Sequence, residues 1–138
     1  MGATTLQVAQ GSLEWFRQGK TIEETSELMR STLMLSKLGN LEAADATEKL
    51  TSTLNGFKLE AEDASLVVDK LIDLDNRYST SAKEISTALQ YSATSAQQAG
   101  VSFNELASYI TVISSVSRRS AESIGQSFGK IEALRYNS

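Results

Sequence analysis

The chain has 138 residues and a formal net charge of −4, and 41% of its residues are hydrophobic. This length suits a single domain with a modest core, and the negative balance argues against a nucleic-acid-binding surface. The chain contains no Cys and no His. That composition excludes disulfides, thiolate nucleophiles, zinc sites of the usual kind and the commonest general base near neutral pH.

The lack of proline predicts a fold that is helical throughout. An average chain of this length carries about seven prolines, and this one has none. Proline ends or kinks helices, and the apolar residues here recur every three or four positions, which is the helical period. We therefore predict an all-α fold without a sheet. The longest apolar stretch, 109–116, is interrupted by Thr and Ser and is far shorter than the ~20 residues that cross a bilayer, so no membrane segment is expected.

The first four predicted helices are separated by glycines and opened by polar or acidic residues. Thr21 and Glu24 have the spacing of a capping box at the start of the second helix. Acidic side chains open the fourth helix, where their charge complements the helix dipole. The four helices cover residues 3–18, 21–37, 41–56 and 60–78.

The last three predicted helices cover 82–99, 103–117 and 121–135. Ser81 with Glu84 and Ser102 with Glu105 again have capping-box spacing. Short helices are marginal without caps and packing, and no apolar heptad runs unbroken across the loops, as a coiled coil would need. We predict about seven short helices that pack as consecutive helical hairpins.

A weak internal repeat is visible in the apolar pairs of three helices. The pairs are Leu50 with Leu54, Ile85 with Leu89, and Ile124 with Phe128. Their separations are of the order expected for helix-pair repeats. Because the spacing is uneven and few residues match, the sequence features that all amphipathic helices share explain the pattern better than a duplication.

No catalytic, cofactor or metal site is predicted. The best calcium candidate is 73–84, in which Asp73, Asp75 and Glu84 fall on EF-hand ligand positions. Arg77 stands where a ligand belongs and Tyr78 where the loop needs Gly, so a helix end followed by a capped helix start is the better interpretation. The acidic residues Glu60, Glu62 and Asp63 could suggest acid–base catalysis, but they too are better explained as the start of a helix.

Four residues are candidates for a contact surface. Trp15 and Phe16 are aromatic, as anchors at interfaces often are, but they point about 100° apart on a helix, so at least one turns toward the core. Arg118 and Arg119 form the only adjacent basic pair, which a solvated turn explains better than a contact. The helix within 1–20 is rich in Gln, Gly and Thr, so we expect it to be peripheral.

Over most of its length the sequence resembles the core region of bacteriophage tail tape measure proteins. The segments that carry the resemblance occur in the order found in that family, and they are "LTSTLNGFKL", "VVDKL", "SAKEISTALQ", "AGVSFNEL" and "RRSAESIG". "LEWFRQGKTIEETSEL" and "LSKLGNLEAADATE" are similar to the part before it. Each segment is only moderately specific, whereas their order over about ninety residues is much more so.

The resemblance implies a structural, non-enzymatic role. Family members set tail length during assembly and occupy the tail tube in several copies. The resemblance therefore implies that residues 1–138 are one helical domain of a much longer protein. Expected partners are other copies or the rest of the tape measure chain, and tail tube and distal tail proteins. The expected location is the virion tail, and the host bacterial cytoplasm during assembly.

Two other functions are compatible with the sequence. One is a generic helical interaction module of a bacterial adaptor or secretion protein, because capped amphipathic helices serve many partners. The other is an enzyme with an all-carboxylate site that includes Glu60 and Asp63, although no substrate suggests itself.

Overall fold

The described part of the chain is entirely helical. The computed structural model describes residues 13, 15–78, 80–117, 126 and 129–130. Within these ranges there is no strand, which confirms the predicted all-α class for this part of the chain. The elements are α2 (Ile22–Gly39), α3 (Ala43–Gly56), the 3-10 turn η1 (Ala61–Asp63), α4 (Ala64–Arg77), α5 (Ala82–Gln98) and α6 (Phe103–Ser117).

The number of helices differs from the prediction of about seven. The described residues hold six helical elements, which are five α-helices and one 3-10 turn. The helix predicted at 60–78 is divided into that 3-10 turn and α4. In that turn the Asp63 N–H donates to the Glu60 carbonyl at 3.0 Å, an i to i+3 bond that tightens the backbone. The predicted helices 3–18 and 121–135 lie mostly outside the described residues. Of them, residues 13, 15–17, 126 and 129–130 are described, and these are helical.

The predicted capping signals fix where helices begin. Thr21 Oγ1 accepts the Glu24 N–H, and Glu24 Oε1 accepts the Thr21 N–H, which completes a capping box before α2. The same reciprocal pair joins Ser102 and Glu105 before α6. Ser81 accepts the Glu84 N–H before α5. Local i to i+3 bonds of this kind depend on few residues, which is why the sequence predicts them well.

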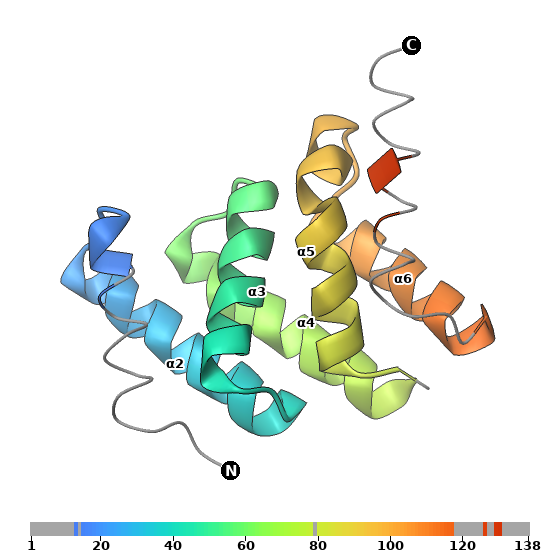
Figure 1. The fold of residues 1–138 in the computed structure, drawn as a ribbon, viewed down its shortest axis with the longest axis horizontal. Helices are drawn as coiled ribbons and strands as arrows, with labels where there is room; N and C mark the ends of the chain where they lie inside the picture. Colours follow the sequence, from blue (N-terminus) through green and yellow to red (C-terminus); the bar gives the residue numbers. More distant parts are fainter. Residues whose placement is uncertain (1–12, 14, 79, 118–125, 127–128, 131–138) are drawn as a thin grey trace.

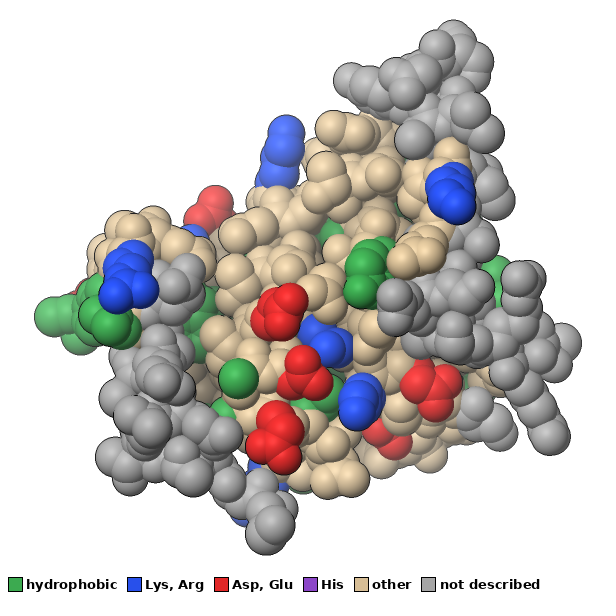
Figure 2. All heavy atoms as spheres, viewed as in Figure 1, with side chains coloured by type: hydrophobic (Ala, Val, Ile, Leu, Met, Phe, Trp, Pro, Cys, Tyr) green, Lys and Arg blue, Asp and Glu red, His purple; other side chains and the backbone are tan. Residues whose placement is uncertain are grey.

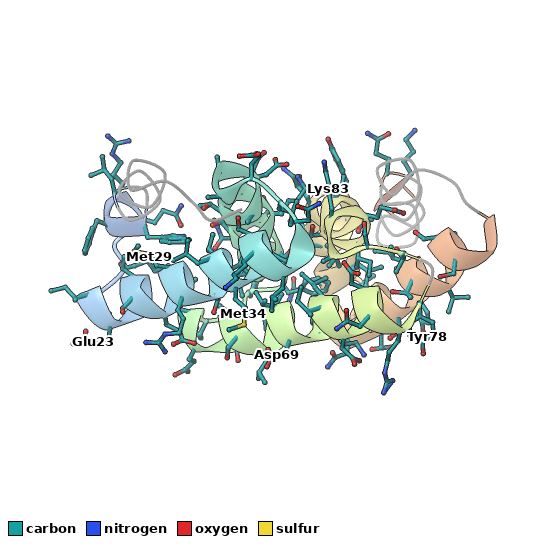
Figure 3. The ribbon with its side chains drawn as sticks, turned by 90° about the horizontal axis from the view of Figure 1, so that it is seen from below. Glu23, Met29, Met34, Asp69, Tyr78 and Lys83 are labelled. Carbon is teal, nitrogen blue, oxygen red and sulfur yellow. The ribbon has the colours of Figure 1, made fainter. Side chains whose placement is uncertain are left out.

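The helices form two crossed layers (Figure 1). Helices α2, α4 and α6 run the same way in one layer, while α3 and α5 run back in the other. Figure 3 shows α3 and α5 nearly end-on against the layer of α2 and α4, with Glu23 and Tyr78 at opposite ends of that layer. The most extensive packing joins α3 to α5 and α2 to α4. Consecutive helices do pack on each other, as α2 on α3 and α5 on α6, but the most extensive contacts skip one helix. The predicted series of consecutive hairpins is corrected to that extent, because α2 and α3 pack mainly on α4 and α5.

A recurring linker turns the chain from the α3–α5 layer back into the α2–α4–α6 layer. Gly19, Lys58 and Gly100 all have positive φ, and each stands two residues before a helix start, at Thr21, Glu60 and Ser102 respectively. In each linker the next N–H reaches a carbonyl five residues back: Lys20 to Trp15 at 3.1 Å, Leu59 to Leu54 at 2.8 Å, and Val101 to Ala96 at 2.8 Å. This pattern is the Schellman ending of a helix.

The spacing of these three linkers fits a helix-pair repeat, although the end of α2 has the same backbone form, with Asn40 at φ +57 and the Leu41 N–H 3.0 Å from the Ser36 carbonyl. Thr21 and Glu60 are 39 positions apart, and Glu60 and Ser102 are 42 apart. By the first offset Ala46 and Leu50 of α3 correspond to Ile85 and Leu89 of α5, and all four are at most 1% exposed. Matching the Leu50–Leu54 pair to the Ile85–Leu89 pair, as the sequence suggested, therefore places α3 and α5 out of register by one helical turn. The structure supports a true repeat, each unit of which packs on the next.

The layer of α3 and α5 extends on both sides. Before α3, the indole Nε1 of Trp15 donates to Thr51 Oγ1 at 3.2 Å. Between the two helices, Gly56 lies so close to Ala93 that an added Cβ would meet the Ala93 Cβ at 2.5 Å. After α5, a Cβ added to Gly129 would lie 3.2 Å from the Tyr91 carbonyl. Each helix of this layer thus contacts the following helix of the same layer, through residues 36 to 38 positions apart in the chain.

The repeated linkers predict opposite effects for two substitutions. Lys58 adopts φ +58, whereas Gly100 adopts φ +84 with open space around it. Left-handed backbone costs a residue with a Cβ roughly 1 kcal/mol, while glycine carries an entropic cost in the unfolded chain. We expect Lys58→Gly to leave the free energy of unfolding unchanged or to raise it by up to about 0.5 kcal/mol. Gly100→Ala should lower it by about 1 kcal/mol. Urea denaturation measures both, and a loss for Lys58→Gly as large as that for Gly100→Ala would contradict the shared linker geometry.

Candidate interaction surfaces

The two aromatic candidates of the first helical segment lie in different environments. Trp15 is 1% exposed and belongs to the hydrophobic core, where it lines a small internal space with Leu28, Leu54 and Ala61. Phe16 is 50% exposed. Trp15 thus anchors the start of the chain inside the fold and offers no surface to a partner. Phe16 stays a predicted contact residue, and Arg118 and Arg119 lie outside the described residues.

Two of the three carboxylates of the calcium candidate have another structural role. Asp73 pairs with Arg77 at 3.2 Å within α4. Asp75 Oδ2 accepts the N–H of Ala82 at 2.8 Å and so ties the end of α4 to the start of α5. The Glu84 N–H is bonded to Ser81. In the part of the chain that the structure describes, no three acidic side chains group so as to hold a metal ion.

Calcium is therefore expected to leave the stability unchanged. A ligand that binds only the native state raises the melting temperature, by an amount that grows with the ratio of its concentration to its Kd, and Asp75 Oδ2 is already bonded to the Ala82 N–H. Thermal denaturation in millimolar calcium and in chelator should give the same midpoint. A saturable rise of several degrees that Asp73→Asn removes would contradict this prediction.

An acidic hollow of about 490 Å³ lies where α2 and η1 begin. It is lined by Ala61 and by five glutamates, which are Glu23, Glu24, Glu27, Glu60 and Glu62. Hydrogen bonds from the Thr21 backbone N–H and, to a lesser extent, from the Thr21 side chain lower the pKa of the Glu24 carboxyl below its ordinary value. Carboxylates are favoured at helix N-termini because the exposed N–H groups carry partial positive charge. Helix starts therefore account for this acidic surface.

A second hollow of about 220 Å³ occupies the equivalent place one repeat later, between the starts of α4 and α6. Its lining includes Leu66, Val67 and Phe103. The two hollows lie between successive helices of this layer, although α4 packs much more extensively on α2 than on α6. Beside the second hollow, the Phe57 and Phe103 rings pack edge to face with centroids 5.9 Å apart.

Large apolar side chains are also exposed at the edges of the stack. At the first edge they are Leu13, Phe16 and Ile22, and on α6 they are Tyr109 and Val112. Figure 2 shows the apolar group of the first edge beside the polar and charged face of α3 and α5. Sequence analysis missed Ile22, Tyr109 and Val112 as surface residues. The spacing of the capping boxes was the signal that could have placed them at equivalent positions of a repeat.

Polar contacts cover the outer face of α3 and α5. Gln90 Nε2 of α5 donates to Glu48 Oε1 of α3 at 2.7 Å. Lys49 is nearly buried, and its ammonium pairs with Asp45 at 3.2 Å on the same helix. Among the described helices, none is long and apolar enough to cross a membrane.

Comparison with known proteins identifies one family. The model of a family described as phage-related minor tail protein matches residues 1–134. No solved structure matches the chain.

Proposed function

The chain belongs to the family of phage-related minor tail proteins, and from that premise we propose that it is a structural domain of a tail tape measure protein. Its role would be tail assembly and tail-length determination, through helix packing and association rather than through catalysis. The family match over nearly the whole chain carries this proposal. The resemblance of the ordered segments from "LTSTLNGFKL" to "RRSAESIG" supports its finer part.

Within a tape measure protein, this segment is proposed to act as a docking domain and not as a length of ruler. A ruler segment is extended, and one continuous helix adds about 1.5 Å per residue. Here the chain reverses direction at every linker, so that α2 to α6 lie side by side in two layers (Figure 1). The proposed partners are other copies or the rest of the tape measure chain, together with tail tube and distal tail proteins. The proposed locations are the virion tail and, during assembly, the host cytoplasm.

Deletion of the segment from its phage gene tests this role. In-frame removal of 21–135 should abolish tail assembly or leave tails of irregular length, because partners lose their docking surface. Electron microscopy of lysates measures tail length and number. Viable phage with uniform tails shorter by about 170 Å, the length of 115 residues as a single helix, would show that the segment is ruler. Normal tails would refute a role in assembly and would favour a helical interaction module unrelated to tails.

A further inference from the structure

The contact between successive helices of the α2–α4–α6 layer uses the same positions twice. At the first contact, Leu28 of α2 and Ala61 of η1 line one internal space. At the second, Val67 of α4 and Phe103 of α6 line the hollow between the starts of those two helices. Val67 follows Leu28 by 39 positions and Phe103 follows Ala61 by 42, which are the offsets between the capping boxes. One position therefore faces the following helix, and another faces the preceding helix.

On α6 the positions that face a following helix are exposed. Tyr109 corresponds to Leu28 and Val67, which are each 2% exposed, but Tyr109 itself is 49% exposed. Val112, which is 60% exposed, corresponds to Ser31 of α2, which is 3% exposed, and to Lys70 of α4, which is partly buried. Both side chains are apolar although nothing in the described chain covers them. Together they form what we call the trailing face of the stack.

At the opposite edge, the position that faces a preceding helix is exposed. Ile22 of α2 corresponds to Ala61, which is 3% exposed, and to the partly buried Phe103. Ile22 is 73% exposed. Along the same side of α2, Met29 and Leu33 are only partly buried. This leading face is again apolar where the internal repeats are covered.

We propose that copies of this chain associate head to tail, with the trailing face of α6 in one copy packed on the leading face of α2 in the next. A second copy is the occupant because each face already meets its counterpart twice within the chain, at α2–η1/α4 and at α4–α6. The two faces lie at opposite edges of the layer, and α2 and α6 run in the same direction (Figure 1). One copy can therefore follow another as α4 follows α2. Such a contact is heterologous, so it builds rings or filaments rather than closed twofold dimers.

The repeat also specifies which residues meet. Leu28 with Ala61 and Val67 with Phe103 are the first two members of a series whose third member is Tyr109 of one copy with Ile22 of the next. The chain contains no cysteine, so a thiol can be placed at either position alone. Both side chains are accessible in a single copy, which keeps the risk of misfolding low.

A mixing experiment with the full chain tests the proposal. Ile22→Cys and Tyr109→Cys chains, one carrying an affinity tag, are treated with a short bis-maleimide separately and together. We expect a covalent dimer in the mixture, containing one chain of each kind, at a yield at least about tenfold above either chain alone. Crosslinking of Tyr109→Cys alone to the same yield would overturn the head-to-tail arrangement. If the mixture gave no dimer at a millimolar concentration of the chain, the association itself would be overturned.

Charge substitutions give an independent readout by sedimentation of the otherwise unchanged chain. Val112→Asp and Ile22→Asp should each weaken self-association at least tenfold, which corresponds to about 1.4 kcal/mol. Leu66→Asp is the control, because Leu66 is 66% exposed and lines the hollow between α4 and α6 within one chain, not either edge face; it should change the association constant by less than about twofold. Equal effects of all three would overturn the assignment of the two faces. Circular dichroism establishes that each variant is folded.

The inference rests on the proposed function for its biological meaning, since it names the contact by which copies would associate in a tail. The proposed self-association and the proposed function are tested by separate experiments. Crosslinking of purified chain depends only on the repeat, whereas tail length in the deletion phage depends only on the role in assembly.

Discussion

Replacing Gly56 by Val is expected to lower the free energy of unfolding by about 3 kcal/mol. Gly56 ends α3 and lies against Ala93 and Thr94 of α5. A Cβ at this position would lie 2.5 Å from the Cβ of Ala93, 3.1 Å from the backbone N of Thr94 and 3.2 Å from the Ala93 carbonyl carbon. Contacts this short require the two helices to move apart. Because two of the three nearest atoms are backbone, rotation of a side chain cannot relieve the clash.

A pair of variants separates overpacking from other effects at this site. Gly56→Ala should be destabilising even though alanine is the better helix former by about 1 kcal/mol. Adding Ala93→Gly should recover only part of the loss, because the backbone of Thr94 stays in place. Asn55→Val is the control, since Asn55 is the exposed neighbour on the same helix. Urea denaturation measures all four variants, and a stabilised Gly56→Ala would show that α3 and α5 are not packed this closely.

Replacing Ile110 by Asp is expected to destabilise the fold by about 4 kcal/mol and to release α6 from α4 and α5. Ile110 is fully buried at 0% exposure and belongs to the core cluster with Leu106 and Ala107. An aspartate there loses the apolar contacts of isoleucine. It must also either remain charged without water or take up a proton, and both options cost free energy.

Ser102→Ala provides the comparison on the same helix. Ser102 Oγ accepts the Glu105 N–H at 3.2 Å, so its loss removes one side of a capping box. The expected cost is about 1 kcal/mol. Hydrogen exchange should show local loosening at the start of α6 for Ser102→Ala, and loss of protection along the whole helix for Ile110→Asp. Similar effects of the two substitutions on unfolding free energy would mean that α6 is not packed as the structure shows.

Helix positions and helix starts were predictable because they depend on neighbours in the chain. The range 103–117 matches α6 exactly as predicted, and α5 ends one residue before the predicted end. Thr21 with Glu24 and Ser102 with Glu105 form the expected boxes. The 3-10 turn at 61–63 was not predicted, since the acidic residues there suit either kind of helical start.

The arrangement of the helices was harder to predict. Hairpins between consecutive helices are the simplest result of short loops, yet here α3 packs mainly on α5 and α2 on α4. The repeat that produces this arrangement has weak side-chain identity. It is expressed instead in backbone geometry, at Gly19, Lys58 and Gly100, and one of these three is a lysine that no glycine pattern reveals.

The amino-acid order alone thus decided that the chain is helical, where its helices start, and which family its segments resemble, because caps and periodicity act over three or four residues. Only the tertiary structure decided that Trp15 is core while Phe16 is exposed, that Gly56 packs tightly against α5, and which apolar residues remain uncovered at the edges of the stack. Those features depend on contacts between residues 36 or more positions apart, such as Trp15 with Thr51. Packing of whole helices sets these contacts, and no short stretch of sequence encodes them.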